Sequence, residues 1–387
     1  MSITAIIKPT HGCNFVCSYC YIEPEAEKGR MSEKTLSNIV EQVTFVNRLR
    51  GTMPSFIWHG GEPLLMKSSF FEKIVELQDP HTSFETNIGR FKHDDKEYVF
   101  VNDSVYSANN SIQSNGSLLT KDLAKQLYDL GYHLGTSLDG PCPINNLTRS
   151  LKNGEGSFDA IYKGSEIAKE AGIGGGIITV LNKNNVHKVE ELYEFYKEKN
   201  LSPKVNPLIK SGSAAINYED LGITPREYGE AMIKFFDLWY NDKDSKINID
   251  PLDEIIGNLY YGTTSSCNFT DNCQENFISI GPQGDVYPCG RFDGIKEFKL
   301  GNINDQNLNE MLDSDLRKTL LSRNSDYIDG CNTCEYKPIC NSGCMHNAYT
   351  HSGNILEKDY YCGAYKMIFK HIEKVMGESN IKRGVEV

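Results

Sequence analysis

Hydrophobic and polar positions follow two different periods in the first part of the chain. Apolar residues recur at helical spacing in several stretches, for example at Leu36, Ile39, Val40 and Val43. Between such stretches, short apolar runs predict strands at residues 3–7, 55–58, 110–114, 134–138, 174–180 and 204–208. Six strands, each followed by a helix, predict an α/β fold with a parallel sheet and helices outside it. This pattern alone fits both a doubly wound sheet and a partial barrel.

Local signals predict where several elements begin and end. Thr120 is expected to cap a helix that Gly131 stops, and Thr224 with Glu227 is expected to cap a helix reaching about residue 240. The turn at residues 281–285 predicts a hairpin between strands at 277–280 and 285–287. About thirty residues separate the helix expected near residues 70–77 from the strand that begins at residue 110. The charged stretch 91–103 within this connection predicts a solvated insertion.

Composition adds a domain boundary and limits the classes of partner. The 387 residues suffice for a large and a smaller domain, and periodicity fades near residue 240. We therefore expect domains at residues 1–240 and 241–387. The net charge of −12 argues against a nucleic-acid partner. The chain shows no secretory signal and no apolar run of membrane-spanning length, which predicts a cytoplasmic protein without a membrane partner.

Twelve cysteines are the strongest chemical signal. In a reducing compartment they favour metal ligation over disulfides. Cys142 stands alone and is expected to be a small buried hydrophobe. The other cysteines form an early group of three and a late group of eight, namely Cys13, Cys17 and Cys20, then Cys267, Cys273, Cys289, Cys331, Cys334, Cys340, Cys344 and Cys362.

The early group forms one short loop directly after the first strand. Three thiolates can bind three irons of a [4Fe–4S] cube and leave the fourth iron open to a small molecule. The residues of this loop alone fit a zinc knuckle equally well. Further motifs end the next three strands, at residues 59–63 (HGGEP), 113–116 (QSNG) and 137–141 (SLDGP). Each motif alone is typical of a turn, but their shared position at strand ends matches the active face of barrel enzymes.

The cysteine spacing and these motifs together resemble the radical SAM superfamily. The resemblance implies a partial (β/α)6 barrel and S-adenosylmethionine as a cofactor on the open iron. One electron then yields a 5′-deoxyadenosyl radical, which abstracts a substrate hydrogen. Cys13, Cys17 and Cys20 would be the cluster ligands. The implied contacts to the cofactor are Tyr19, Gly60, Gly61, Glu62, Ser114, Asn115, Ser137 and Arg149.

The late cysteines resemble a SPASM domain. The pair Cys331 and Cys334 alone would favour zinc, but the full spacing and the hairpin match the SPASM pattern. The resemblance implies two auxiliary [4Fe–4S] clusters, hence three clusters in all, and a C-terminal helix after them. The first auxiliary cluster would take Cys267, Cys273, Cys289 and Cys344. The second would take Cys331, Cys334, Cys340 and Cys362.

Our main prediction for the reaction is a peptide maturase. It would form an oxidative crosslink, such as an aromatic carbon to a β-carbon, in a ribosomally made precursor peptide. The alternative is an anaerobic sulfatase-maturating enzyme, which converts Cys or Ser to formylglycine. Those enzymes carry an Asp, the candidate general base, where this chain has Gly290. Asp293 is close to Gly290 in sequence and is our candidate for that catalytic role. Arg291 is expected either to meet a substrate carboxylate or to form a surface ion pair.

Two further expectations concern partners and a third class of function. The substrate would be a precursor peptide or a protein, and the reducing partner a flavodoxin or ferredoxin. A simple electron carrier would not need Glu62 or Arg149, so this class is disfavoured. His346 is expected to be a structural histidine.

Overall fold

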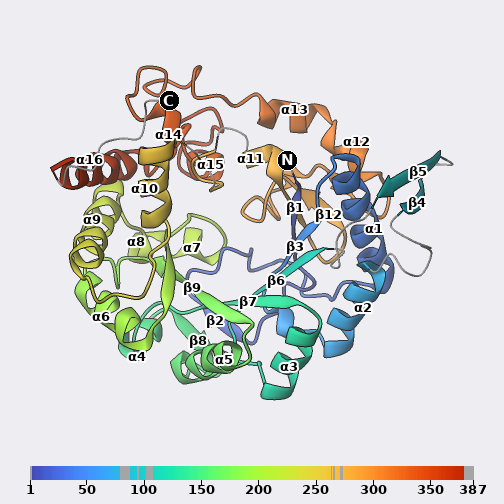
Figure 1. Ribbon diagram of the computed structural model, residues 1–387, viewed down its shortest axis with the longest axis horizontal. Coiled ribbons are helices and arrows are strands. Elements are labelled where there is room, and N and C mark those ends of the chain that lie inside the picture. The colour runs from blue at the N-terminus through green and yellow to red at the C-terminus, as the bar shows by residue number, and fades with distance from the viewer. Residues whose placement is uncertain are drawn as a thin grey trace.

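A curved parallel sheet forms the centre of the molecule. The computed structural model describes residues 2–78, 88–93, 96–101, 108–262, 264, 266–270 and 273–378. Six parallel strands lie side by side in chain order, and Figure 1 shows helices arranged outside them. The α/β prediction is therefore confirmed, and both ends of every strand lie within two residues of their predicted positions. The strands are β1 (Thr4–Ile7), β3 (Ser55–Trp58), β6 (Asn109–Ser114), β7 (Tyr132–Ser137), β9 (Gly174–Leu181) and β10 (Ser202–Pro207).

Helices connect these strands and cover their outer face. The long ones are α1 (Glu33–Leu49), α2 (Ser68–Gln78), α3 (Lys121–Asp129), α5 (Phe158–Glu170), α6 (Val189–Lys199) and α9 (Pro225–Asn241). Short helices α4 (Cys142–Asn145), α7 (Ser213–Ile216) and α8 (Tyr218–Leu221) lie between them. The predicted caps are confirmed: Thr120 accepts a hydrogen bond from the Leu123 amide, and Thr224 and Glu227 form a complete capping box. Both devices satisfy amides that a helix start leaves without partners.

The segment predicted as an insertion contains a hairpin. Strands β4 (Ile88–His93) and β5 (Lys96–Val101) pair with each other in a separate antiparallel sheet. Figure 1 shows this hairpin at the right edge of the molecule, away from the sheet centre. Residues 94, 95, 102 and 103 of the predicted insertion lie outside the described residues.

The cysteine-rich part of the chain continues the same sheet. Strand β11 (Phe277–Ile280) pairs with β1 in parallel, and β12 (Asp285–Tyr287) and β13 (Gly301–Asn302) follow in antiparallel order. The predicted hairpin is thus confirmed. Its turn needs Gly284, which has a φ of +90° and where a Cβ would lie 2.5 Å from Asn304.

Seven further helices, of which the last is the longest, complete the described portion of this part. They are α10 (Leu252–Tyr261), α11 (Cys273–Asn276), α12 (Leu308–Leu312), α13 (Asp315–Leu321), α14 (Lys337–Cys340), α15 (Met345–Ser352) and α16 (Cys362–Glu378). The last of these packs against α9, so the chain's end returns to the barrel. A small second sheet joins β2 (Phe15–Cys17) to β8 (Arg149–Leu151). No helix in the described part of the chain is both long and apolar enough to cross a membrane.

A buried amide fastens the first strand to the first helix. Asn47 is fully buried; its Oδ1 accepts from the Ile3 amide at 2.7 Å, and its Nδ2 donates to the Ile3 carbonyl at 3.0 Å. Asn47→Ala leaves both backbone groups of Ile3 without these partners, so we expect the free energy of unfolding to fall by about 2–3 kcal/mol. Urea unfolding measures this change. Asn309→Ala, at an exposed position, is the control, and equal losses in both variants would contradict the role of Asn47.

Candidate active site

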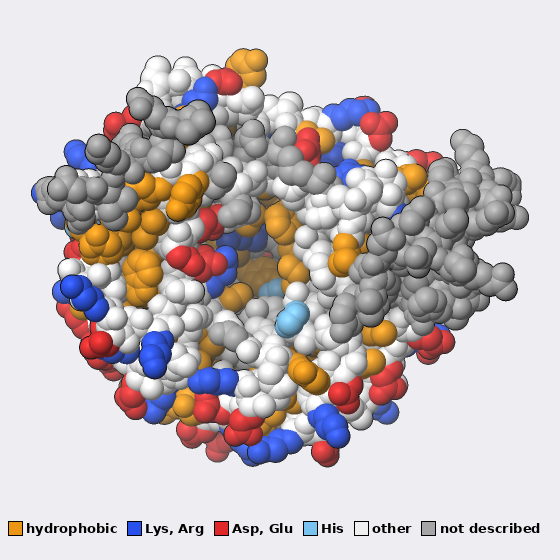
Figure 2. All heavy atoms as spheres, viewed as in Figure 1, with side chains coloured by type: hydrophobic (Ala, Val, Ile, Leu, Met, Phe, Trp, Pro, Cys, Tyr) orange, Lys and Arg blue, Asp and Glu red, His pale blue; other side chains and the backbone are white. Residues whose placement is uncertain are grey.

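A large cavity opens at the carboxyl ends of the parallel strands. It has a volume of about 550 Å³, and Figure 2 shows the hollow near the centre of the face. Loops from the barrel and from the cysteine-rich part line it together. The sequence-predicted residues that line it are Cys13, Cys17, Tyr19, Cys20, Gly60, Gly61, Ser114, Asn115, Ser137, Arg149, Cys267, Cys273, Cys289, Arg291 and Cys344. Glu62, Asp293 and the four remaining cysteines do not line it.

The early cysteine loop presents its three thiols to this cavity. Strand β2 within the loop pairs with β8, which sets Cys17 opposite Arg149. The Phe15 amide donates to Cys13 Sγ at 3.4 Å. Burial raises the pKa of Cys17 to about 12, although the charge of Arg149 opposes this rise. The three cysteines therefore line one cavity, and their assignment as the ligands of a cluster with one open iron stays a prediction.

Glu62 lies behind the cavity wall as a buried acceptor. It is 0% exposed, and it accepts hydrogen bonds from the Leu64 amide at 2.8 Å, the Ser114 hydroxyl at 2.7 Å and the Asn115 amide at 2.8 Å. Burial outweighs these bonds and raises the pKa of Glu62 to about 7. A cationic group brought next to this carboxylate would offset the cost of its burial.

The two glycines before Glu62 serve close packing of the chain. Gly60 has a φ of +104°, and a Cβ there would lie 2.4 Å from the Thr10 carbonyl. A Cβ on Gly61 would lie 2.3 Å from the Gly12 carbonyl. The motif thus lets the end of β3 touch the backbone that leads into the cysteine loop, and any larger residue would push the two apart.

A buried ion pair holds the arginine of the site. Asp139 is 0% exposed and accepts from Arg149 Nε at 2.9 Å, from the Val180 amide at 3.0 Å and from the Tyr19 hydroxyl. The Arg149 guanidinium also lies over the Tyr19 ring, 5.2 Å from its centre. Our sequence reasoning assigned Tyr19 and Arg149 to the site but missed Asp139. The SLDGP motif was the available signal.

Removing the negative charge of Asp139 should lower the stability of the protein. Asp139→Ala leaves the Arg149 guanidinium buried without its partner, so we expect a fall of more than about 5 °C in the thermal midpoint. Glu230→Ala is the matched control because its ion pair with Arg226 lies on the surface, where such pairs contribute little. Differential scanning calorimetry of both variants checks the difference. Equal midpoints would contradict the buried role of Asp139.

Asp293 lies outside the cavity in a buried charge cluster. It is 4% exposed, and its Oδ2 lies 2.8 Å from Lys8 Nζ and 3.6 Å from His11 Nε2. Burial would raise its pKa, but Lys8 and His11 together hold the pKa below its usual value. Lys8 Nζ also donates to the Gly290 carbonyl at 3.2 Å. The structure therefore places Asp293 in an ion pair, away from the space that a substrate can enter.

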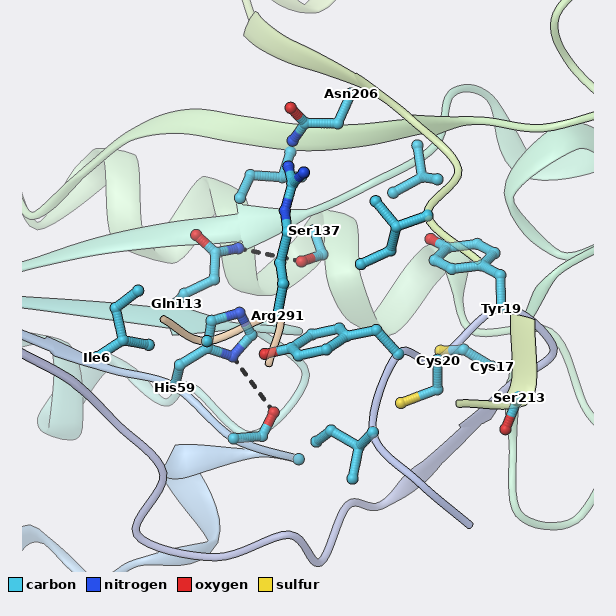
Figure 3. Close-up of a pocket in the computed structure, with 18 of the residues that line it drawn as sticks. Ile6, Cys17, Tyr19, Cys20, His59, Gln113, Ser137, Asn206, Ser213 and Arg291 are labelled. Carbon is cyan, nitrogen blue, oxygen red and sulfur yellow. Dashed lines mark hydrogen bonds between the residues drawn. The ribbon is translucent and has the colours of Figure 1, made fainter. Parts of the chain in front are cut away.

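Arg291, in contrast, reaches into the cavity. Figure 3 shows its side chain extending among the lining residues. Its Nη1 lies 3.4 Å from Cys344 Sγ and 3.5 Å from Asn347 Oδ1. None of the ion pairs among the described residues includes Arg291, so the expectation of a surface ion pair is wrong. His346 also lines the cavity; it is fully buried and packs edge-on against Phe292.

Of the late cysteines, only Cys267, Cys273, Cys289 and Cys344 line the cavity. The division of all eight into two cluster-binding sets stays a prediction. Burial raises the pKa of Cys273 to about 12 and that of Cys289 to about 11, and thiols of the first set add to both shifts. The thiols of the other set likewise raise the pKa of Cys340 after burial does. Asp359, which our sequence reasoning missed, links the sets because it accepts from the Cys344 amide at 2.8 Å and lies three residues before Cys362. All twelve cysteines are free thiols, and Cys142 is exposed, so its predicted burial is wrong.

Comparison with known proteins assigns the family. The model of the radical SAM superfamily matches residues 7–196, and the SPASM model, an iron-sulfur cluster-binding domain, matches residues 260–335. The chain thus carries a radical SAM domain followed by a SPASM domain. The two domains imply [4Fe–4S] clusters and S-adenosylmethionine as cofactors. The thiols that line the cavity fit the clusters.

Similar proteins span nearly the whole radical SAM chain. A cysteine-type anaerobic sulfatase-maturating enzyme of Clostridium perfringens (strain 13) is 28% identical over 383 residues, covering 95% of this chain and 96% of the relative. A serine-type enzyme of Bacteroides thetaiotaomicron is 26% identical and covers 96% and 89%.

Solved structures agree with this similarity. The structure of native anSMEcpe with bound AdoMet and Cp18Cys peptide matches with a TM-score of 0.79 and 26% identity, covering 98% of this chain and 99% of that one. Streptococcus suis SuiB bound to precursor peptide SuiA matches with a TM-score of 0.65 and 17% identity, over 93% and 76% of the two chains. The second likeness shows a shared fold alone.

Proposed function

We propose that this protein matures another protein by oxidising a Cys or Ser residue of it to formylglycine. The observation that carries the proposal is the similarity to sulfatase-maturating enzymes of both types over almost the full length of the chain. It includes a structure that holds a peptide together with AdoMet. These comparisons favour formylglycine formation over the crosslinking reaction that we expected first. The crosslinking prediction is not confirmed.

The residues of the barrel suit the binding of the cofactor. Cys13, Cys17 and Cys20 would hold the first cluster, since no other cysteine of the barrel lines the cavity. Glu62 would receive the ammonium group of S-adenosylmethionine, and Arg149, held by Asp139, would receive its carboxylate. When bound, S-adenosylmethionine and its cluster supply the radical chemistry that removes a hydrogen atom from the substrate. The largely apolar wall of the cavity would keep water away from that reaction.

The SPASM cysteines would hold two further clusters in different surroundings. The set with Cys267, Cys273, Cys289 and Cys344 lines the cavity and so would lie beside the substrate. The set with Cys331, Cys334, Cys340 and Cys362 does not line it. Oxidation of a substrate releases an electron, and the first set is placed to hold its acceptor. Three clusters per chain are therefore proposed.

One observation favours crosslinking as a second candidate. Gly290 lines the cavity at the position where the resemblance to sulfatase-maturating enzymes implies an Asp. Asp293 is paired with Lys8 and does not line the cavity. A crosslink between two residues of a peptide requires the loss of a different proton from formylglycine formation, and unlike the conversion of Cys to formylglycine it needs no water.

Mass spectrometry of peptide substrates tests the proposal. The reconstituted protein is incubated without oxygen with reductant, S-adenosylmethionine and peptides that carry either a sulfatase maturation motif or aromatic residues. We expect an aldehyde on the Cys or Ser of the motif, which a hydrazide reagent labels. A loss of two hydrogens without an aldehyde, with fragments missing between two residues, would establish the second candidate and overturn the first.

A further inference from the structure

The cavity contains a histidine for which the proposed function has so far given no role. His59 follows β3 directly, lines the cavity and is labelled in Figure 3. Its Nδ1 lies 3.3 Å from the Gly60 carbonyl, the contact drawn as a dashed line. A carbonyl only accepts, so this bond places the ring proton on Nδ1 and leaves a lone pair on Nε2. The geometry therefore gives the cavity a neutral nitrogen that can accept a proton.

We propose that Nε2 of His59 is the proton acceptor in the oxidation of the substrate. This inference rests on the proposed function. After a hydrogen atom has left the β-carbon of a substrate Cys, the residue is a radical of the form R–CH•–SH. It loses a proton from sulfur to His59 and an electron to an acceptor of the iron–sulfur class, which gives the thioaldehyde R–CH=S. Water then replaces sulfur, and the products are the aldehyde and hydrogen sulfide.

The surroundings of His59 keep its ring neutral. Burial lowers its pKa to about 4, and the positive charge of Lys8 acts in the same direction. The groups that face it are Lys8 and Tyr21: the Tyr21 ring lies edge-on to His59 at 5.8 Å, and Lys8 Nζ lies 4.7 Å from the centre of the Tyr21 ring. Lys8 is itself paired with Asp293. At neutral pH the ring thus carries no proton on Nε2.

The other basic groups on the cavity wall are already engaged or lie elsewhere. His11 contacts the Glu27 carbonyl at 3.3 Å through Nδ1 and faces Asp293 at 3.6 Å through Nε2. His346 packs against Phe292 on the SPASM side. Glu23 is the one carboxylate among the described lining residues, and its Oε1 accepts from the Gly212 amide at 3.3 Å. Both ring nitrogens of His346 are without a hydrogen-bond partner in the described part of the chain. His59 differs from His346 because the contact with the Gly60 carbonyl places the proton on Nδ1 and leaves Nε2 free to accept.

Gly290 offers an independent way to test this role. Its backbone lines the cavity, and its φ does not lie in the left-handed region. A Cβ added there would lie 3.3 Å from Ile6 Cγ2, a contact that a shift of a few tenths of an ångström relieves. An aspartate at this position would therefore bring a second proton acceptor into the same space without rebuilding the chain.

The experiment compares product with cofactor cleavage in the reconstituted full chain. His59→Gln keeps the size of the side chain but lacks a basic nitrogen. With a motif peptide, we expect the aldehyde to fall about a hundredfold while 5′-deoxyadenosine still forms. His133→Gln, at an exposed position of β7, is the control and should match the wild type. Adding Gly290→Asp to His59→Gln should restore the aldehyde at least tenfold above His59→Gln alone.

Each outcome has a defined meaning. An unchanged ratio of aldehyde to 5′-deoxyadenosine in His59→Gln would overturn the role of His59. Loss of 5′-deoxyadenosine in the same variant would also overturn it, because His59 would then serve the cofactor. If His59→Gln does not retain iron, His59→Asp replaces it, and an aldehyde yield near that of wild type supports the proposal. A wild-type protein that cleaves the cofactor but forms no aldehyde on any motif peptide refutes the proposed function itself.

Discussion

Replacing Cys13, Cys17 and Cys20 together with alanine should abolish the formation of 5′-deoxyadenosine. The three thiols are the cluster ligands that the barrel presents to the cavity, and without them no iron remains to bind and reduce S-adenosylmethionine. Iron should fall from about twelve to about eight atoms per chain, since the two SPASM sets keep their clusters. Iron analysis and chromatography of the reaction mixture after anaerobic reconstitution measure both quantities.

Cys142→Ala is the matched control for the triple variant. Its thiol is exposed and belongs to neither group of cysteines, so iron and 5′-deoxyadenosine should stay at wild-type levels. A triple variant that still cleaves the cofactor would refute the assignment of the loop. An iron content near four atoms in the wild type would refute the three clusters.

The second large effect concerns Glu62 and pH. Its pKa is raised from the usual value of 4.5 to about 7, so the folded protein holds the proton more tightly than the unfolded chain does. The stability that this proton contributes is present below about pH 4.5 and is lost as the pH rises through about 7. An ammonium group next to the ionised Glu62 carboxylate would offset this loss of stability. We therefore expect S-adenosylmethionine to bind more weakly at about pH 6 than at about pH 8.

Thermal unfolding with and without S-adenosylmethionine measures this linkage. The rise in the midpoint that the cofactor causes should be larger at the higher pH. Glu62→Gln removes the titrating group, so its cofactor affinity should be about tenfold lower and should no longer change over this range. A wild-type protein whose midpoint rises equally at both pH values would show that Glu62 does not meet a cation.

Local patterns predict the strands and helices of the barrel because each element carries its own period and caps. Thr120, Thr224 and the turn at residues 281–285 show this, since their partners lie within a few residues. Contacts between distant residues have no such signal. Lys8 and Asp293 are separated by most of the chain, and no sequence pattern near either residue predicts their ion pair. The same holds for Asp139 and Asp359, because the hydrogen bonds that give them their roles come from Arg149 and the Cys344 amide, which the fold places next to them.

The cysteines show what a spacing pattern in the sequence can predict. The resemblance assigned Cys344 to the first set although it lies among members of the second, and the structure places it beside Arg291 at the cavity. The reaction was harder to predict. A single position, Gly290, weighed against formylglycine formation, whereas similarity over the whole chain favours it. Because Gly290 has no carboxylate, only the arrangement of the other cavity residues can indicate which group accepts the proton instead.

Strand β1 is hydrogen-bonded on both sides, to β3 of the barrel and to β11 of the SPASM part. A chain cut after α9 would expose four residues of unpaired backbone at the middle of the molecule, which is a template for aggregation. The two domains are therefore not interchangeable modules. Anyone who wishes to graft a new SPASM domain onto this enzyme must also redesign the first strand, and new substrates are more readily sought by changing the cavity loops.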